Sequence, residues 1–221
     1  MKKTLICKIL AMAIAGVATL SATSALAQGG SDAFNRTTLG PKWVVTSGTL
    51  AITNHALTGA TGSLGYLTTS SHDTAASAVV SLGGTDLEYG AIALGNIAGG
   101  SNAFVKIQAQ NAAGTFDHAA FYNANNSGSD FFALSSPVPS PATLDVFFCG
   151  TTGILRITSA AGVQKYTFNY GTTYGAGGGL GTYGSVSIDN YVGFHSACSD
   201  ALVNSIPSST MPHDTDLSLV K

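Results

Sequence analysis

Short runs of hydrophobic residues, or of alternating hydrophobic and polar residues, recur along the chain after residue 27, and turn-forming residues separate them. Gly, Ser, Thr and Asn occur throughout these runs, where they weaken or interrupt helices. We therefore expect no helix beyond residue 27 and an all-β sandwich or barrel of short strands. The expected strands are Lys42–Thr46, Thr49–Thr53, Leu64–Thr68, Ala75–Leu82, Tyr89–Asn96, Ala103–Gln110, Phe116–Asn123, Asp130–Leu134, Ala142–Cys149, Gly153–Ser159, Val163–Asn169 and Ser185–His195.

The segment 103–123 is expected to form a β-hairpin around a turn at residues 111–115. Because side chains alternate between the two faces of a strand, a symmetric hairpin separates an apolar face from a polar one. The apolar face contains two opposed pairs, Val105 with Phe121 and Ile107 with Ala119. The other face carries Phe104, Lys106, Gln108, Gln110, Phe116, His118 and Tyr122.

A second hairpin is expected over residues 154–169, with Ala161-Gly162 as its turn. Its inward pairs are Leu155 with Phe168 and Ile157 with Tyr166. The outward side chains are Arg156, Thr158, Lys165 and Thr167. A slip of one residue would place a charged arginine in the core, so the choice of inward face is constrained.

The two ends of the chain differ in character from the middle. Residues 1–27 combine basic residues, an apolar stretch from Ile9 to Leu20 and the A-x-A sequence Ala25-Leu26-Ala27. This pattern is typical of a secretory signal peptide, and cleavage would leave Gln28 as the first residue. The alternative is a retained membrane anchor, which needs about 20 apolar residues, whereas Ser21 and Thr23 interrupt this run. We expect a secreted protein with a domain at 28–198 and a tail or extension at 199–221.

Charge is scarce in this chain of 221 residues, since only 9% of the residues are Asp, Glu, Lys or Arg. Removal of residues 1–27 takes away three basic residues and no acid, which lowers the net charge from −2 to about −5. A nucleic-acid-binding protein needs clustered basic residues, and so does a protein that binds anionic membrane surfaces. The composition therefore argues against a nucleic-acid-binding protein and against a polybasic protein of membrane surfaces.

Two cysteines remain after the leader, Cys149 and Cys198. In an oxidising compartment this pair suggests a disulfide, which would close a loop of about 50 residues and stabilise the fold by roughly 3–4 kcal/mol. The alternative is a pair of buried free thiols. Zinc binding is disfavoured because neither cysteine has a second ligand pair nearby; His195 alone lies three residues before Cys198.

Several short motifs near the two ends of the 28–198 segment resemble the concanavalin A-like lectin/glucanase superfamily. The first motif reads Asp32-Ala33-Phe34-Asn35-Arg36, and Leu39-Gly40-Pro41-Lys42-Trp43 follows it. Near the other end stands Ile188-Asp189-Asn190-Tyr191. The resemblance implies a jelly-roll sandwich of two antiparallel sheets with about six strands each. It also implies that the first and last strands pair, which would bring Phe34 near Ile188.

The chain departs from the superfamily at two places. Leu50 occupies a position that is often Trp, and the paired glutamates of the glucanases are missing, because Glu88 is the one glutamate in the chain. A glycosidase needs two carboxylates across the scissile bond. Asp86 and Glu88 would share one face of an extended segment, but acids at the start of a strand are commonly solvated. The glucanase activity therefore does not transfer to this chain.

The polar face of the first hairpin is the best candidate for a sugar-binding site, because sugars are recognised by aromatic platforms beside amide and charged groups. The alternative is that this face packs against other parts of the protein or is ordinary surface. The candidate residues are Lys106, Gln108, Gln110, Phe116, His118 and Tyr122. Modules of this fold often bind calcium, and Asp32 and Asp189 would approach each other if the terminal strands pair.

Three hypotheses of function remain at this point. The first is a secreted, non-enzymatic, lectin-like protein whose partner is a glycan or polysaccharide. The second is a structural or adhesive surface protein that self-associates, since its Thr-, Ser- and Asn-rich strands carry few of the charges that protect sheet edges. The third is a divergent polysaccharide hydrolase whose activity would depend on Glu88.

Overall fold

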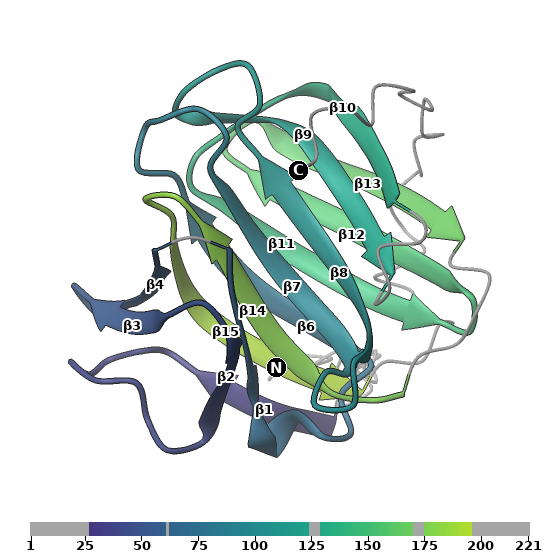
Figure 1. Cartoon of the computed structure of the whole chain (residues 1–221). Helices are drawn as coiled ribbons and strands as arrows, with labels where there is room; N and C mark the ends of the chain where they lie inside the picture. Colours follow the sequence, from purple (N-terminus) through teal and green to yellow (C-terminus); the bar gives the residue numbers. More distant parts are fainter. Residues whose placement is uncertain (1–26, 61, 124–128, 170–174, 196–221) are drawn as a thin grey trace, which may run out of the picture.

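A computed structural model describes residues 27–60, 62–123, 129–169 and 175–195, and Figure 1 shows its two β-sheets stacked face to face. Every strand pairing in these residues is antiparallel. Within the described ranges, the helical content is a single 3₁₀ turn, Thr68–Ser70. The expected all-β sandwich is therefore confirmed.

One sheet has eight strands. Its spatial order is β13 (Gly162–Asn169), β12 (Thr152–Ser159), β11 (Ala142–Cys149), β6 (Ala75–Ser81), β15 (Ser187–His195), β4 (Ala56–Gly59) and β3 (Leu50–Thr53), with β1 (Ala27–Asp32) also paired to β15. The pairing of β1 with β15 confirms that the first and last strands meet. Phe34 and Ile188 are both fully buried in the same hydrophobic cluster.

The other sheet has seven strands. Its order is β10 (Ser129–Pro139), β9 (Thr115–Asn123), β8 (Ser101–Gln108), β7 (Tyr89–Asn96), β14 (Gly178–Tyr183), β5 (Ser63–Leu67) and β2 (Trp43–Ser47). Both sheets are larger than the six strands expected, because β1, β4 and β14 were not recognised in the sequence pattern. The bounds expected for β7 and β11 are confirmed, whereas β10 extends five residues beyond Leu134 to Pro139.

The strand β4 was not predicted from the sequence, because an unusual turn precedes it. Asn54 and His55 connect β3 to β4, and both have left-handed backbones, with φ values of 51° and 62°. Two consecutive residues with positive φ are typical of the type I′ turn that joins tight hairpins. A histidine at the second position is not a recognised signal for that turn, so the hairpin was missed.

The strand β14 was not predicted from the sequence because it is rich in glycine, which weakens the interior of a strand. A Cβ atom on Gly181 would lie 2.6 Å from the ring of Phe104, and one on Gly178 would overlap the hydroxyl of Tyr191. Both neighbours are aromatic side chains on other strands, so β14 accepts glycine where its two faces meet these rings. β14 is nevertheless a central strand between β7 and β5.

The first expected hairpin has the predicted register. In the β8–β9 pair, Val105 lies opposite Phe121 and Ile107 lies opposite Ala119. The register predicted for the second hairpin was wrong by two residues. Leu155 lies opposite Tyr166 and not Phe168, and the turn is one position earlier, at 160–161. A shift of two keeps every side chain on its predicted face.

Aromatic side chains join the two sheets across the core. Phe121 of β9 stacks on Phe168 of β13 with ring centroids 3.8 Å apart, and Phe132 of β10 lies 5.0 Å from Tyr166 of β13. At the other end of the sandwich, Trp43 of β2 meets the ring of Tyr191 of β15 at 5.8 Å. All six rings belong to the main hydrophobic cluster between the sheets.

The first motif of the sequence forms a clasp around one carboxylate. Asp32 accepts two hydrogen bonds from the guanidinium of Arg36, at 2.6 and 2.5 Å, and one from Trp43 Nε1 at 2.7 Å. The backbone N–H of Phe34 donates a further bond. Burial raises the pKa of the Asp32 carboxyl, but the bonds from Arg36, Trp43 and Phe34 outweigh burial and hold that pKa below its ordinary value.

We predict that Asp32→Asn destabilises the fold by about 2 kcal/mol, because a charged acceptor of several hydrogen bonds is lost. The folded-state pKa of Asp32 is depressed, so its stabilisation is full above the ordinary pKa of 3.8 and is lost as pH falls through the folded value. Urea unfolding at pH 7 and pH 3 measures this. The exposed Asp86→Asn is the control, and an equal change in both variants contradicts the clasp.

Candidate functional site

The outer face of the seven-stranded sheet carries an unusual number of aromatic rings. Residues directly opposite each other in an antiparallel pair share a face, so the register across β5, β14, β7, β8, β9 and β10 places three rows of side chains side by side. We call this surface the aromatic face. Its rows are Tyr66–Gly179–Ala93–Phe104–Tyr122, then Leu64–Gly181–Ala91–Lys106–Ala120–Phe131, then Tyr183–Tyr89–Gln108–His118–Ala133.

The middle row is built mainly from small residues. Ala91 and Ala120 flank Lys106 on the two neighbouring strands, and Gly181 continues the row on β14. Because these residues project little, the larger rings of the neighbouring rows can lie over the lysine. Lys106 is therefore 6% exposed although it lies on the face that points away from the core.

Aromatic rings surround the Lys106 ammonium. Its Nζ atom lies 4.4 Å from the centroid of the Tyr89 ring, 5.4 Å from Tyr122 and 6.0 Å from Phe131. The rings also contact one another, since Phe104 packs edge-on against Tyr89 at 6.1 Å. Cation–π contacts stabilise the charged ammonium, by about 2 kcal/mol or more where water is excluded.

Aromatic stacking extends the face at both ends. Tyr183 stacks on Tyr89 with ring centroids 5.4 Å apart and an interplanar angle of 12°. On the far side, His118 stacks on Phe131 at 4.8 Å and 9°. The planes are thus held in place before any ligand arrives, which lowers the ordering cost of binding.

Several polar atoms on the aromatic face have no hydrogen-bond partner among the described residues. They are Gln108 Oε1, Tyr122 Oη and His118 Nδ1. Gln108 uses its Nε2 group to donate to Gln110 Oε1 at 2.5 Å. His118 Nδ1 lies 3.1 Å from Asp117 Oδ1, a charged neighbour. Buried polar atoms without partners are uncommon, and they mark places where a ligand can bind.

Burial controls the ionisation of the face. It lowers the pKa of the Lys106 ammonium to about 8, and no carboxylate contributes to that shift. Burial likewise raises the pKa of the Tyr122 hydroxyl to about 12, with a further contribution from Tyr89. At neutral pH Lys106 therefore carries a positive charge beside the neutral hydroxyl group of Tyr122.

Four of the residues expected to bind sugar, Lys106, Gln108, His118 and Tyr122, lie together on this face, and Gln110 touches Gln108. The placement of Phe116 was wrong, because this ring is fully buried and belongs to the main hydrophobic cluster. Strict alternation failed where the pairing of β9 with β10 shifts between Ala133 and Val138. The rings that the prediction missed come from other strands: Tyr89, Tyr183 and Phe131.

The two acids expected to hold calcium make other contacts. Asp32 is occupied by the clasp described above, and Asp189 accepts a hydrogen bond from the backbone of its neighbour Asn190. Among the described residues, no three His, Cys, Asp or Glu side chains cluster as metal ligands would. Calcium at Asp32 and Asp189 stays a prediction that these contacts do not support.

Glu88, the one glutamate, is a structural anchor for two loops. Its carboxylate accepts hydrogen bonds from the backbone N–H groups of Gly83, Gly84 and Ser185 and from the Thr85 hydroxyl, at 2.8–3.1 Å. Burial raises the pKa of this carboxyl, but the hydrogen bonds outweigh burial and lower it below its ordinary value. Asp86 is exposed. Glu88 therefore lacks the raised pKa that a general acid needs.

Cys149 ends β11, and its expected disulfide partner, Cys198, lies outside the described residues. The disulfide therefore stays a prediction, as do the leader at 1–27 and the tail at 199–221. No helix in the described part of the chain is long and apolar enough to cross a membrane.

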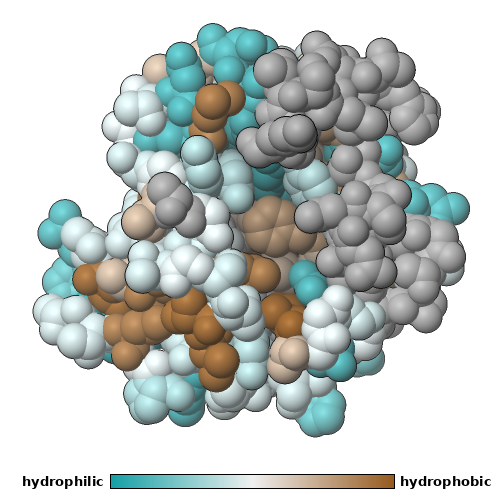
Figure 2. Space-filling model, viewed as in Figure 1, coloured by the Kyte–Doolittle hydropathy of each residue, from teal (hydrophilic) through white to brown (hydrophobic). Residues whose placement is uncertain are grey.

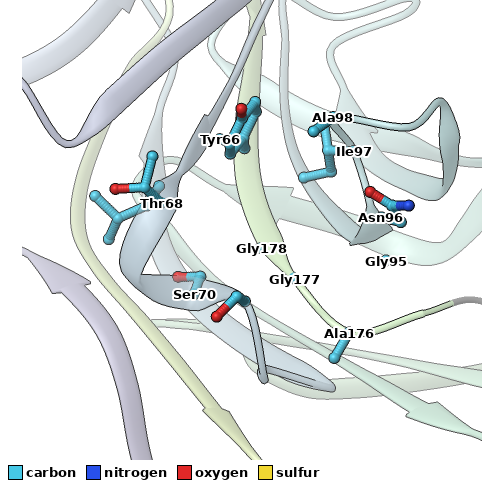
Figure 3. Close-up of a pocket in the computed structure, with 12 residues that line it drawn as sticks. Tyr66, Thr68, Ser70, Gly95, Asn96, Ile97, Ala98, Ala176, Gly177 and Gly178 are labelled. Carbon is cyan, nitrogen blue, oxygen red and sulfur yellow. The ribbon is translucent and has the colours of Figure 1, made fainter.

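A small pocket of about 110 Å³ lies beside the aromatic face, at the ends of β5, β7 and β14. Figure 3 shows Tyr66 on one side of it and Asn96 and Ile97 on another. Because Tyr66 belongs to the aromatic face, the pocket continues that surface beyond the tyrosine. In Figure 2, apolar side chains gather in the lower left of the same view, where β2 lies, and this strand exposes Val44 and Val45.

No protein-family model matches the chain, and no curated protein matches its sequence. Solved structures do match its fold. The structure described as Bacteroides ovatus Xyloglucan PUL GH43B is 16% identical, with a TM-score of 0.52, and the match covers 77% of this chain and 40% of that one. The Crh5 transglycosylase in complex with NAG is 10% identical, with a TM-score of 0.52, and the match covers 78% of this chain and 86% of that one.

A third match, the carbohydrate-binding module CBM66 from Bacillus subtilis, is 13% identical with a TM-score of 0.47 and covers 70% of this chain and 92% of that one. The chain thus spans less than half the length of the Bacteroides protein and most of the other two. At these identities the matches show the fold. The chain shares a β-sandwich fold of two antiparallel sheets with the Bacteroides and Crh5 structures.

We predict that Glu88→Gln destabilises the fold by about 2 kcal/mol. The amide of Gln would place its own N–H donors where the Glu88 carboxylate accepts hydrogen bonds from backbone N–H groups. The folded-state pKa of Glu88 is lowered, so the difference from the wild-type protein shrinks as pH falls through that value. Thermal melts between pH 7 and pH 3 measure it. A wild-type melting curve with loss of turnover on a polysaccharide would instead show a catalytic Glu88.

Proposed function

We propose that the protein is a secreted, non-enzymatic carbohydrate-binding protein and that the aromatic face is its binding surface. The observation that carries this proposal is the row arrangement on the seven-stranded sheet, where the rings of Tyr89, Tyr122 and Phe131 surround the Lys106 ammonium beside unpaired polar atoms. Sugars present apolar C–H faces and a rim of hydroxyl groups, and this surface offers partners for both.

Stacking would begin at the more accessible rings. Tyr183 is 39% exposed and is held parallel to Tyr89, so a sugar ring can lie on it without reordering the side chain. Tyr66, at the opposite end of the face, borders the small pocket, which has room for a substituent of a sugar ring. Binding along the face between these tyrosines would engage several sugar units of a chain.

The hydrogen bonds that Glu88 and Asp117 accept favour a binding role over hydrolysis. The carboxylate of Glu88 accepts hydrogen bonds from four donors, and the carboxylate of Asp117 accepts hydrogen bonds from the backbone N–H groups of Gln110 and Asn111. A hydrolase needs one acid that is free to donate a proton and a second that is free to attack or to activate water. These two carboxylates serve the backbone instead.

We predict that Tyr183→Ala weakens binding to the preferred glycan by about tenfold, which corresponds to roughly 1.4 kcal/mol for one stacked ring. A glycan array identifies the ligand, and isothermal titration measures the affinity. Val163→Ala is the matched control, since Val163 is 47% exposed on β13 of the other sheet. Equal affinities in the two variants would remove the aromatic face from the proposal.

Self-association is the second candidate function, and the edge strand β13 favours it. This strand of eight residues ends one sheet and exposes Val163. Light scattering that grows with protein concentration, with no glycan bound on the array, would replace the first proposal with this one. Val163→Lys would then suppress the association, because a lysine on an edge strand opposes pairing with another sheet.

Export is the part of the proposal that depends on residues 1–27. We predict that a bacterial host with a signal peptidase releases a product that starts at Gln28, which lies within β1 and pairs with Phe194. N-terminal sequencing of the periplasmic or culture fraction measures this. Replacing Ala25 and Ala27 by bulky residues removes the small side chains at the cleavage site and should leave the leader attached. An intact leader on the wild-type protein would contradict export.

A further inference from the structure

Lys106 is a buried cation without an anionic partner among the residues that the structure describes. It is 6% exposed, it forms no hydrogen bond or ion pair with any described residue, and no carboxylate influences its ionisation. Asp117, the neighbour of His118 on β9, is occupied by the backbone N–H groups of Gln110 and Asn111. Arg156, by contrast, forms an ion pair with Asp145 at 2.8 Å on the other sheet. Lys106 thus lacks the partner that the protein supplies elsewhere.

The rings around Lys106 offset only part of the penalty of burying its charge. Tyr89 lies 4.4 Å from Nζ, while Tyr122 and Phe131 are more distant. An ammonium has three N–H donors, and ring faces are weak acceptors compared with oxygen. A methionine or leucine would fill the same space without desolvating a charge, so the lysine is unfavourable for folding alone.

We propose that Lys106 binds the negatively charged group of an acidic sugar, so that the ligand is a glycan bearing carboxylate or sulfate groups. This inference rests on the carbohydrate-binding function proposed above and names the class of ligand for that face. The ammonium supplies the charge, while the rings of Tyr89 and Tyr122 contact the apolar side of the same sugar.

The neighbouring polar atoms distinguish a sugar from a simple anion. Gln108 Oε1 is a hydrogen-bond acceptor without a partner, and it repels an anion but accepts from a hydroxyl group. The hydroxyl of Tyr122 is also unpaired and both donates and accepts. A ligand that satisfies all three residues carries an anionic group and hydroxyl groups together, as acidic sugars do and the sulfate ion does not.

Binding should depend on pH in a direction set by Lys106. The titratable groups around it are Tyr89 on β7 and His118 and Tyr122 on β9; Asp130 of β10 lies opposite Phe121, whose side chain faces the core. Above the pKa of Lys106, about 8, the ammonium loses its charge and the acidic ligand loses its partner. The tyrosines stay neutral until higher pH, because burial raises their pKa values.

The test uses an array of neutral, uronate-bearing and sulfated oligosaccharides, followed by titration of the strongest binder. We expect the strongest binder to be acidic, its affinity to fall with added salt, and its affinity to drop tenfold or more between pH 7 and pH 9.5. The uronate and sulfate members of the array separate the two sources of charge. For a uronate, the methyl ester removes the charge and keeps the sugar, so it should bind at least tenfold more weakly.

Lys106→Met is the decisive variant, because it removes the charge and keeps an unbranched side chain. It should weaken acidic binding tenfold or more, abolish the dependence on pH and unfold at a higher temperature than wild type, since an unpaired buried charge is gone. Lys42→Met, which removes an exposed lysine, is the control and should change neither property. A purely structural Lys106 predicts instead that Lys106→Met binds as wild type does.

Two further outcomes separate this inference from the proposed function. If wild-type protein binds neutral sugars best and Lys106→Met retains that binding, the protein is a carbohydrate-binding protein and the acidic ligand is wrong. If no oligosaccharide binds, the proposed function fails and the inference fails with it.

Discussion

The packing of one sheet against the other determines what each strand can present to solvent. Phe121, Phe132 and Trp43 occupy the core side of the seven-stranded sheet and meet Phe168, Tyr166 and Tyr191 across the interface. Because neighbouring residues of a strand point to opposite faces, filling the core with these rings sets which side chains lie outside. The aromatic face is thus a consequence of the core, built from the intervening positions of the same strands.

Small residues on the central strands give this outer face its character. Gly181, Ala91 and Ala120 form a low row on either side of Lys106, and the rings of Tyr89, Tyr122 and Phe131 cover the lysine. Larger side chains in that row would push the rings apart and expose the ammonium to water. The unusual state of the lysine therefore arises from five strands together, β7, β8, β9, β10 and β14, and it is this state that points toward an acidic ligand.

The scarce acids have a structural role that suits a protein with few charges. Asp32 joins the first strand to Arg36 and Trp43, and Glu88 joins the loops around residues 83–85 and 185. Each carboxylate satisfies several donors that would otherwise be partly buried without partners. The motif that resembles lectin and glucanase domains is, in this chain, a stabilising clasp. Because Asp32 and Glu88 are engaged in these hydrogen bonds, the outer face is left to neutral and cationic groups.

Alternation of polar and apolar residues was sufficient to determine the all-β class, most strand positions and the inward face of both hairpins, because the period of a strand is local. It also placed Lys106, Gln108, His118 and Tyr122 on one surface. Tertiary structure decided the rest. The glycines of β14 are acceptable only because rings from other strands fill their space, and the contribution of Tyr89, Tyr183 and Phe131 depends on which strands become neighbours. Phe116 entered the core at an irregular pairing of β9 with β10, which no local pattern encodes. Pairing between distant strands depends on the whole core, and so the site emerged only when the sheets were assembled.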